Sequence, residues 1–141
     1  MNIAYDERKT ELVNAMKNGI TDAIGITEQI GDKLLDCSHL FRVEHSEDVF
    51  NDLSEGINNL SDLVDFIREL KRSMGTLKGH TSVEPFLSPW NRSLEVFQEM
   101  LSAFESKDWV TLSDIIQYEL HPLLVEGGRG LSELSESLRD G

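Results

Sequence analysis

Histidine is the residue type in this chain best suited to metal or acid–base chemistry, but the spacing of its four copies is typical of neither. They are His39, His45, His80 and His121. A di-iron site in a ferritin-like bundle needs Glu-x-x-His pairs on facing helices, and none of the four has a glutamate three residues before it. The single cysteine, Cys37, is too little for a cysteine-ligated zinc site and cannot close an intrachain disulfide. The sequence therefore predicts no metal and no cofactor, and we expect Cys37 to be a small core or boundary residue.

Two carboxylates lie close to histidines in the sequence, an arrangement that could support proton transfer. Glu44 precedes His45, and Glu119 lies two residues before His121. On a helix, residues 119 and 121 point about 200° apart and do not share a face. We interpret both pairs as solvated polar residues, and the sequence predicts no catalytic residue.

Gly127-Gly128-Arg129-Gly130 is the string most similar to a ligand-binding loop, because glycine-rich backbone beside an arginine can hold a phosphate. No predicted strand precedes it, and it matches neither the P-loop nor the dinucleotide-binding pattern. Each glycine lowers helix stability by about 1 kcal/mol relative to alanine. We therefore expect a helix-breaking hinge at 127–130, followed by a C-terminal helical tail.

Two apolar groups could bind another protein. One surrounds Pro85 and Pro89 and contains aromatic residues of the kind that anchor interfaces; the other is a short leucine stripe after the hinge. The candidate partner-binding residues are Phe86, Leu87, Trp90, Leu131, Leu134 and Leu138. In the alternative interpretation, the first group covers the open end of its own bundle and the leucines extend the last helix along it.

The elements that must position these residues are amphipathic helices. Apolar residues between 49 and 74 recur every three or four positions, along one side of a helix of about seven turns. They are Val49, Phe50, Leu53, Ile57, Leu60, Leu63, Val64, Ile67, Leu70 and Met74. Ser46 is the expected N-cap of this helix. A similar stripe over 6–38 includes Leu12 and passes through Gly19 without a phase shift, so we expect one long helix there.

Capping signals delimit the other helices. Ser88-Pro89 predicts the start of a third helix, whose expected inner residues are Leu94, Phe97, Met100, Leu101 and Phe104. Asp108 is the expected N-cap of a fourth helix, which Pro122 should distort. Residues 75–88 are predicted to form a loop, unusually long for a helical bundle.

Together these helices predict an all-α fold, an antiparallel, up-down-up-down four-helix bundle that forms a single domain over 1–141. At about 1.5 Å per residue, each of the first two helices spans more than about 40 Å. Because the third is shorter, its end of the bundle must be covered by the 75–88 loop or left open.

Residues 108–124, DWVTLSDIIQYELHPLL, resemble a segment of small uncharacterised bacterial helical proteins. In architecture alone, the chain is also similar to small helical chaperones of bacterial flagellar or secretion systems, although it contains none of their motifs. The resemblance implies a helical protein and assigns it no activity.

Charge narrows the range of partners. The chain has 26 acidic and 13 basic residues, a formal net charge of −13. Such a field repels nucleic-acid phosphates and anionic lipid, so we expect neither nucleic acid nor membrane as a partner. No apolar run approaches eighteen residues and no secretory leader is present, which predicts a cytoplasmic protein.

We therefore predict a non-enzymatic, protein-binding helical bundle, similar in role to a chaperone or adaptor. Two alternatives remain. One is a ligand-binding or enzymatic bundle with a pocket between its helices, for which Thr27 and Tyr118 are the only polar candidates on the inner stripes. The other is a structural homodimer with the C-terminal leucines as its seam.

Overall fold

The computed structural model describes residues 3–76 and 82–140, which are almost entirely helical. The elements are α1 (Ile3–Leu40), α2 (Glu47–Thr76), α3 (Glu84–Leu87), the 3₁₀ helix η1 (Ser88–Arg92), α4 (Ser93–Glu105), α5 (Trp109–Ile115), the π-helical turn η2 (Ile116–Leu120) and α6 (His121–Asp140).

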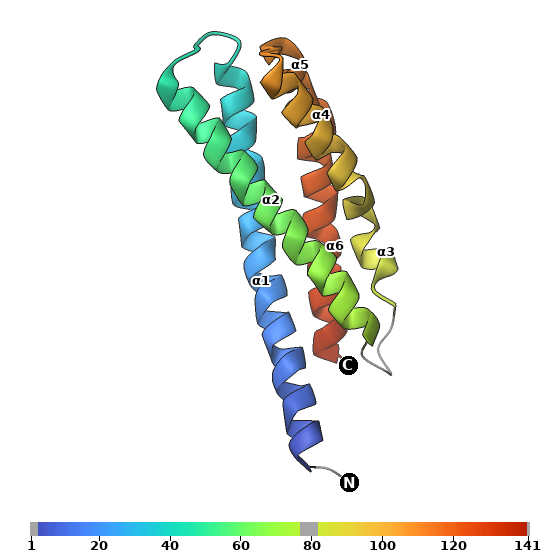
Figure 1. Ribbon diagram of the computed structural model, residues 1–141. Helices are drawn as coiled ribbons and strands as arrows, with labels where there is room; N and C mark the ends of the chain where they lie inside the picture. The colour runs from blue at the N-terminus through green and yellow to red at the C-terminus, as the bar shows by residue number, and fades with distance from the viewer. Residues whose placement is uncertain (1–2, 77–81, 141) are drawn as a thin grey trace.

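These elements form four antiparallel rods, as Figure 1 shows. The first two rods are α1 and α2, the third runs from α3 through η1 to α4, and the fourth runs from α5 through η2 to α6. The described residues contain no strand. The prediction of an all-α, up-down-up-down four-helix bundle is therefore confirmed.

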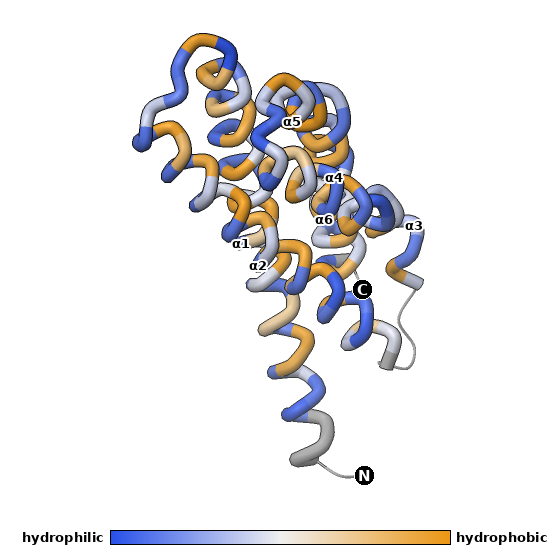
Figure 2. Tube along the Cα trace, turned by 45° about the horizontal axis from the view of Figure 1, so that its top comes forward, coloured by the Kyte–Doolittle hydropathy of each residue, from blue (hydrophilic) through white to orange (hydrophobic). Residues whose placement is uncertain are grey.

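The first rod is continuous through Gly19, as predicted. Its N-terminal turns extend beyond the C-terminal end of α6 (Figure 1). Leu12 on α1 is 45% exposed, so its assignment to the inner stripe was wrong. Farther along, hydrophilic and hydrophobic residues alternate on α1 and α2 as expected of amphipathic helices (Figure 2).

The second rod carries the most regular stripe, and every predicted inner residue on α2 is buried or half-buried. The Ser46 hydroxyl accepts a hydrogen bond from the Val49 N–H at 3.3 Å, which confirms the predicted N-cap. α2 crosses α1 obliquely and ends near α3 (Figure 1). It therefore shares only part of its length with α1.

The predicted loop at 75–88 is wrong at both ends. Residues 77–81 lie outside the described part of the chain, but α2 continues to Thr76 and α3 begins at Glu84. Pro85 does not prevent this turn, because proline is tolerated where helical N–H groups have no partner. The N–H groups of Phe86 and Leu87 both donate to the Val83 carbonyl.

The predicted helix start at Ser88-Pro89 and the inner face of the third helix also need correction. A 3₁₀ helix begins at Ser88 without a side-chain capping bond, and α4 starts only at Ser93. Leu94 is 49% exposed, whereas Val96 and Ala103 are buried in its place. The tighter 3₁₀ period adds about 20° per residue relative to an α-helix. Over the length of η1 this rotates the following helix by about one residue position.

The fourth rod begins where the sequence indicates, and its helix is irregular just before Pro122, as predicted. Asp108 accepts a hydrogen bond from the Thr111 N–H at 3.2 Å and another from its hydroxyl, and these bonds lower the pKa of the Asp108 carboxyl. Pro122 has no N–H to give to the carbonyl four residues earlier. The backbone forms a π turn just before it, in which His121 N–H donates to the Ile116 carbonyl.

The predicted hinge at 127–130 is wrong, because α6 runs through all three glycines to Asp140. At Gly127 and Gly130 the missing side chains allow other parts of the bundle to approach α6 closely.

Candidate functional site

The aromatic group around Pro89 packs inside the bundle. The Trp90 side chain is only 3% exposed, and its Nε1–H donates to the Gly127 carbonyl at 3.2 Å. A Cβ atom on Gly127 would lie 2.6 Å from the indole ring. Trp90 therefore needs glycine at this position of α6.

Gly130 allows a closer approach still, between two backbones. A Cβ atom there would lie 2.0 Å from the Phe86 carbonyl oxygen, a separation that no side chain could adopt. The two glycines are one helical turn apart and receive α3 and η1 on the same side of α6. We call this contact, formed by Phe86, Trp90, Gly127 and Gly130, the closed seam. It accounts for the glycines without a phosphate or a hinge.

The six predicted partner-binding residues are accordingly not a surface. Phe86 is half-buried, and Leu87, Trp90, Leu131, Leu134 and Leu138 are buried in the core of the bundle. Buried side chains cannot contact a partner unless the bundle opens, so the prediction of a partner surface at these positions is wrong. The alternative interpretation, that both groups cover their own bundle, is confirmed.

The predicted histidine–carboxylate neighbours have separate surroundings. His45 shares a 2.7 Å hydrogen bond with the Phe41 carbonyl and lies against the rings of Phe50 and Trp109. Glu119 lies 3.6 Å from the Arg92 guanidinium, and its charge raises the pKa of Glu99.

His121 lines a second groove, of about 360 Å³, between α1 and α6. His39 is exposed, and His80 lies outside the described residues. Within the described ranges, no group of three or more His, Cys, Asp or Glu side chains is placed to hold a metal ion.

Polar groups inside the bundle are few and hydrogen-bonded. Thr27 is buried, and its hydroxyl donates to the Ala23 carbonyl at 2.6 Å. Tyr118, the other polar residue predicted on an inner stripe, is 72% exposed and does not enter the core. Ser113 was not predicted to be a polar core residue. Its buried hydroxyl donates to the Ser38 carbonyl at 2.7 Å. Burial raises the pKa of the Cys37 thiol, which is a core residue as predicted.

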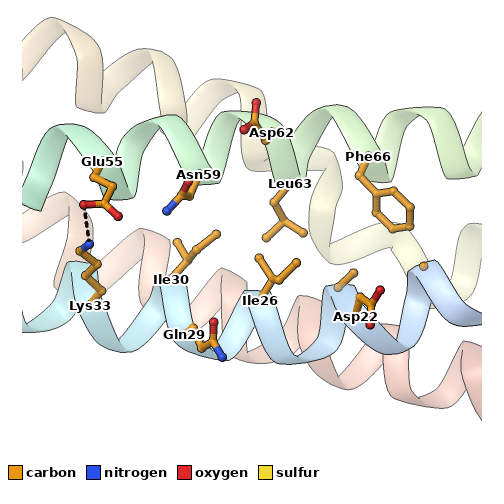
Figure 3. A pocket seen from close by; sticks show the side chains of 12 residues that line it. Asp22, Ile26, Gln29, Ile30, Lys33, Glu55, Asn59, Asp62, Leu63 and Phe66 are labelled. Carbon is orange, nitrogen blue, oxygen red and sulfur yellow. Dashed lines mark ion pairs between the residues drawn. The ribbon is translucent and has the colours of Figure 1, made fainter.

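A concave surface lies between α1 and α2, a groove with a volume of about 640 Å³. Its lining residues are Gly19, Asp22, Ala23, Ile26, Gln29, Ile30, Lys33, Glu55, Asn59, Asp62, Leu63 and Phe66. We call this feature the open groove; Figure 3 shows it from close by.

Helical spacing organises the open groove. One rim consists of Asp22, Ile26, Gln29 and Lys33 on α1, and the other of Glu55, Asn59, Asp62 and Phe66 on α2. Within each rim, successive residues are three or four positions apart and so lie along one line of the helix. The floor is apolar and is made by the buried side chains of Ala23, Ile30 and Leu63.

Apolar side chains also reach the rims. Ile26 is 43% exposed and points toward Leu63 across the open groove (Figure 3). The half-buried Phe66 ring lies against Gly19, where a Cβ atom would be 3.1 Å from the ring. This glycine lets Phe66 rest on α1 and limit one end of the open groove.

The charges of the open groove are uneven along its length. At one end Lys33 and Glu55 form an ion pair across the groove at 3.2 Å. Toward the other end lie Asp22 on α1 and Asp62 on α2 (Figure 3), and among the described residues neither forms an ion pair. The open groove therefore has an excess of negative charge, with one unpaired carboxylate on each rim.

One signal in the sequence could have indicated this surface. Ile26 and Phe66 are apolar residues that fall outside the inner stripes of their helices, and each occupies a polar flank. Such single residues are common on protein surfaces. They become informative only when the fold brings both to the same groove.

Comparison with known proteins identifies the family of the chain but assigns it no activity. A family model described as a domain of unknown function (DUF8042) matches residues 11–126. The match includes residues 108–124, whose resemblance to uncharacterised proteins it supports, and it gives no support to a relationship with chaperones. No curated protein and no solved structure matches the chain. No helix of the described residues has the length and apolar character needed to cross a membrane.

Proposed function

Because the chain belongs to the DUF8042 family, whose description leaves its function open, we propose from the structure that it is a protein-binding bundle. In this proposal the open groove receives an amphipathic helix of another protein. The observation that carries it is the combination of an apolar floor with apolar side chains, Ile26 and Phe66, on the rims of a surface groove.

The dimensions of the open groove suit a helix. The α1 rim extends from Asp22 to Lys33, which at 1.5 Å per residue is about 16 Å, or roughly three helical turns. A helix lying along it would place apolar residues at i, i+3, i+4 and i+7 against the floor, the usual mode of helix-in-groove recognition. The partner would gain by removing its own apolar stripe from water, as in a chaperone or adaptor complex.

The proposed role is non-enzymatic and cytoplasmic. A reduced, buried Cys37 fits a reducing compartment. The rival role is binding of a small apolar molecule in the same groove, whose volume lies within the range of ligand sites. A helix is favoured because the apolar residues extend onto both rims instead of converging on an enclosed cavity.

The experiment is a titration with a designed amphipathic peptide of about 18 residues, five turns, with a leucine stripe and glutamine on both flanks. Nuclear magnetic resonance should show peptide-induced shifts in the backbone amides of residues 19–33 and 55–66. Ile26→Gln should weaken binding about tenfold, since loss of a small apolar contact is worth roughly 1.4 kcal/mol.

The matched control is Leu94→Gln on α4, an apolar residue of similar exposure outside the open groove. This variant should bind the peptide within about twofold of the unmodified protein, the scatter expected of a residue outside an interface. Shifts that map to another surface, or equal effects of the two substitutions, would contradict the proposal. Failure of the peptide to bind would contradict it as well.

A further inference from the structure

The two rims of the open groove carry information about the flanks of its partner. We infer that the open groove selects an amphipathic helix whose apolar stripe is bordered by lysine or arginine on both sides. This inference rests on the proposed function, because it specifies the partner of the same groove.

The charges on the two rims of the open groove do not balance. Among the described residues that line the open groove, Lys33 is the only cationic one, and its ion pair with Glu55 already neutralises it. Asp22 and Asp62 remain without an ion pair among the described residues. A helix with neutral flanks would leave both carboxylates unmatched, and a helix with acidic flanks would be repelled by both.

The positions of the two carboxylates explain why both flanks matter. Asp22 lies on the α1 rim and Asp62 on the α2 rim, so a helix seated between the rims presents a different flank to each. The Asp62 side chain points away from α1 (Figure 3), so only a long side chain of the partner would reach its carboxylate. Coiled coils use the same arrangement, in which charged residues beside the apolar seam choose the partner. Long basic side chains keep their charged ends in water while their stems cover apolar surface. They could therefore also cover Ile26 and Phe66.

The two rim carboxylates should affect the choice among partners and the association rate more than the affinity for any one partner. Charges at the rim of an interface are partly solvated, and they steer encounter and reject wrong partners. The chain as a whole has a net charge of −13, which extends the attraction for a basic segment beyond the open groove. A specific test must separate this general attraction from the contribution of the two rim carboxylates.

The test uses three peptides of about 18 residues, or five turns, that share one leucine stripe and differ only in flanks of lysine, glutamine or glutamate. Dissociation constants are measured by fluorescence anisotropy for the full chain and for two double variants. Asp22→Asn with Asp62→Asn removes the rim carboxylates. Glu133→Gln with Glu136→Gln removes the same charge from exposed positions of α6, outside the open groove.

We expect the lysine peptide to bind about tenfold more tightly than the glutamine peptide, a ratio that corresponds to 1.4 kcal/mol. The rim variant should lose most of this advantage, whereas the α6 variant should retain it. The advantage should also shrink between about 0.1 and 1 M salt, because the screening length falls from about 10 Å to 3 Å. Circular dichroism of both variants checks that the fold is unchanged.

The outcomes separate the two proposals. If the glutamine peptide binds at the open groove and the lysine peptide gains nothing, the proposed function stands and the inference about basic flanks is wrong. If both double variants lose the advantage equally, the attraction is general and the inference is again wrong. If no peptide binds at the open groove, the proposed function itself fails.

Discussion

The closed seam and the open groove each place a glycine against an aromatic ring, but the ring is buried in the first and only half-buried in the second. In each, a glycine on one helix faces an aromatic ring from another element, Gly127 facing Trp90 and Gly19 facing Phe66. In the closed seam the ring is buried and its N–H group is satisfied by the Gly127 carbonyl. In the open groove the ring is half-buried, and Ile26 on the opposite rim remains exposed to solvent.

This difference shows which region of the bundle is fully packed by its own elements. At the closed seam the Trp90 ring of η1 fills the space beside Gly127 and the Phe86 backbone of α3 fills the space beside Gly130, so nothing more can enter. Among the described residues, those that line the open groove belong to α1 and α2 alone. α2 crosses α1 obliquely and leaves it to contact α3 (Figure 1). A partner is therefore expected where two helices diverge, and the aromatic residues most suggestive of an interface belong to the interior.

The largest expected effect comes from removing most of α6 by ending the chain after Glu126. The deletion removes Leu131, Leu134 and Leu138, which are buried in the core, and both glycines of the closed seam. Truncation of one buried leucine costs about 2–5 kcal/mol, and the total stability of a domain is about 5–15 kcal/mol. Thermal melting followed by circular dichroism should show no cooperative transition.

A chain that ends after Leu138 is the control and should still unfold cooperatively. If the 1–126 chain melts like the full chain and light scattering shows that a dimer has become a monomer, the leucines form an interface between copies. The closed seam would then not be needed for folding, and its contrast with the open groove would disappear.

Replacing each aromatic residue by alanine compares the two regions directly. Trp90→Ala should lower the free energy of unfolding by about 3–5 kcal/mol, the usual cost of removing a fully buried aromatic side chain. Phe66→Ala should cost only about 1 kcal/mol, because much of its ring remains in contact with water. Urea titration measures both. Equal losses would mean that the open groove contributes as much to folding as the closed seam does.

Gly128 and Gly130, two positions apart on α6, provide a finer comparison. Gly130→Ala should destabilise the chain by about 1–3 kcal/mol or more, the range for overpacking, because its Cβ would overlap the Phe86 carbonyl oxygen. At Gly128 a Cβ would meet only the Thr27 methyl group, at 3.6 Å. Gly128→Ala should therefore be neutral or raise stability by up to about 1 kcal/mol through helix propensity. Destabilisation by both would contradict the role given to the closed seam.

The helices and their order could be predicted from the sequence because local signals determine them. The stripe on α2, the Asp108 cap and the distortion before Pro122 each depend on residues within a few turns of one another. The closed seam could not be predicted in the same way. Trp90 and Gly127 are 37 positions apart, and a glycine-rich string looks the same whether it breaks a helix or receives another backbone.

The face of the third rod and the open groove were missed for a related reason. The rotation of α4 depends on the 3₁₀ period of η1, and a capping signal at Ser88 does not reveal this period. The open groove depends on the angle at which α2 crosses α1. Ile26 and Phe66 line the same groove only because of that angle. The sequence therefore shows the residues of the candidate site but not that they lie in one groove.

The smallest expected change in stability is at Ile26, and it decides whether the open groove is a surface held for a partner. Ile26→Ala should alter the free energy of unfolding by less than about 0.5 kcal/mol, as is usual at exposed positions. Ile30 lies one turn later on the same helix, in the floor of the open groove, and Ile30→Ala should cost about 2–5 kcal/mol. Urea titration compares the two isoleucines in one backbone setting. A large loss at Ile26 would show that it supports the fold, and the case for an unfilled binding surface would weaken accordingly. A negligible loss, together with weaker binding of the glutamine-flanked peptide, would show an apolar residue that contributes to recognition and not to folding.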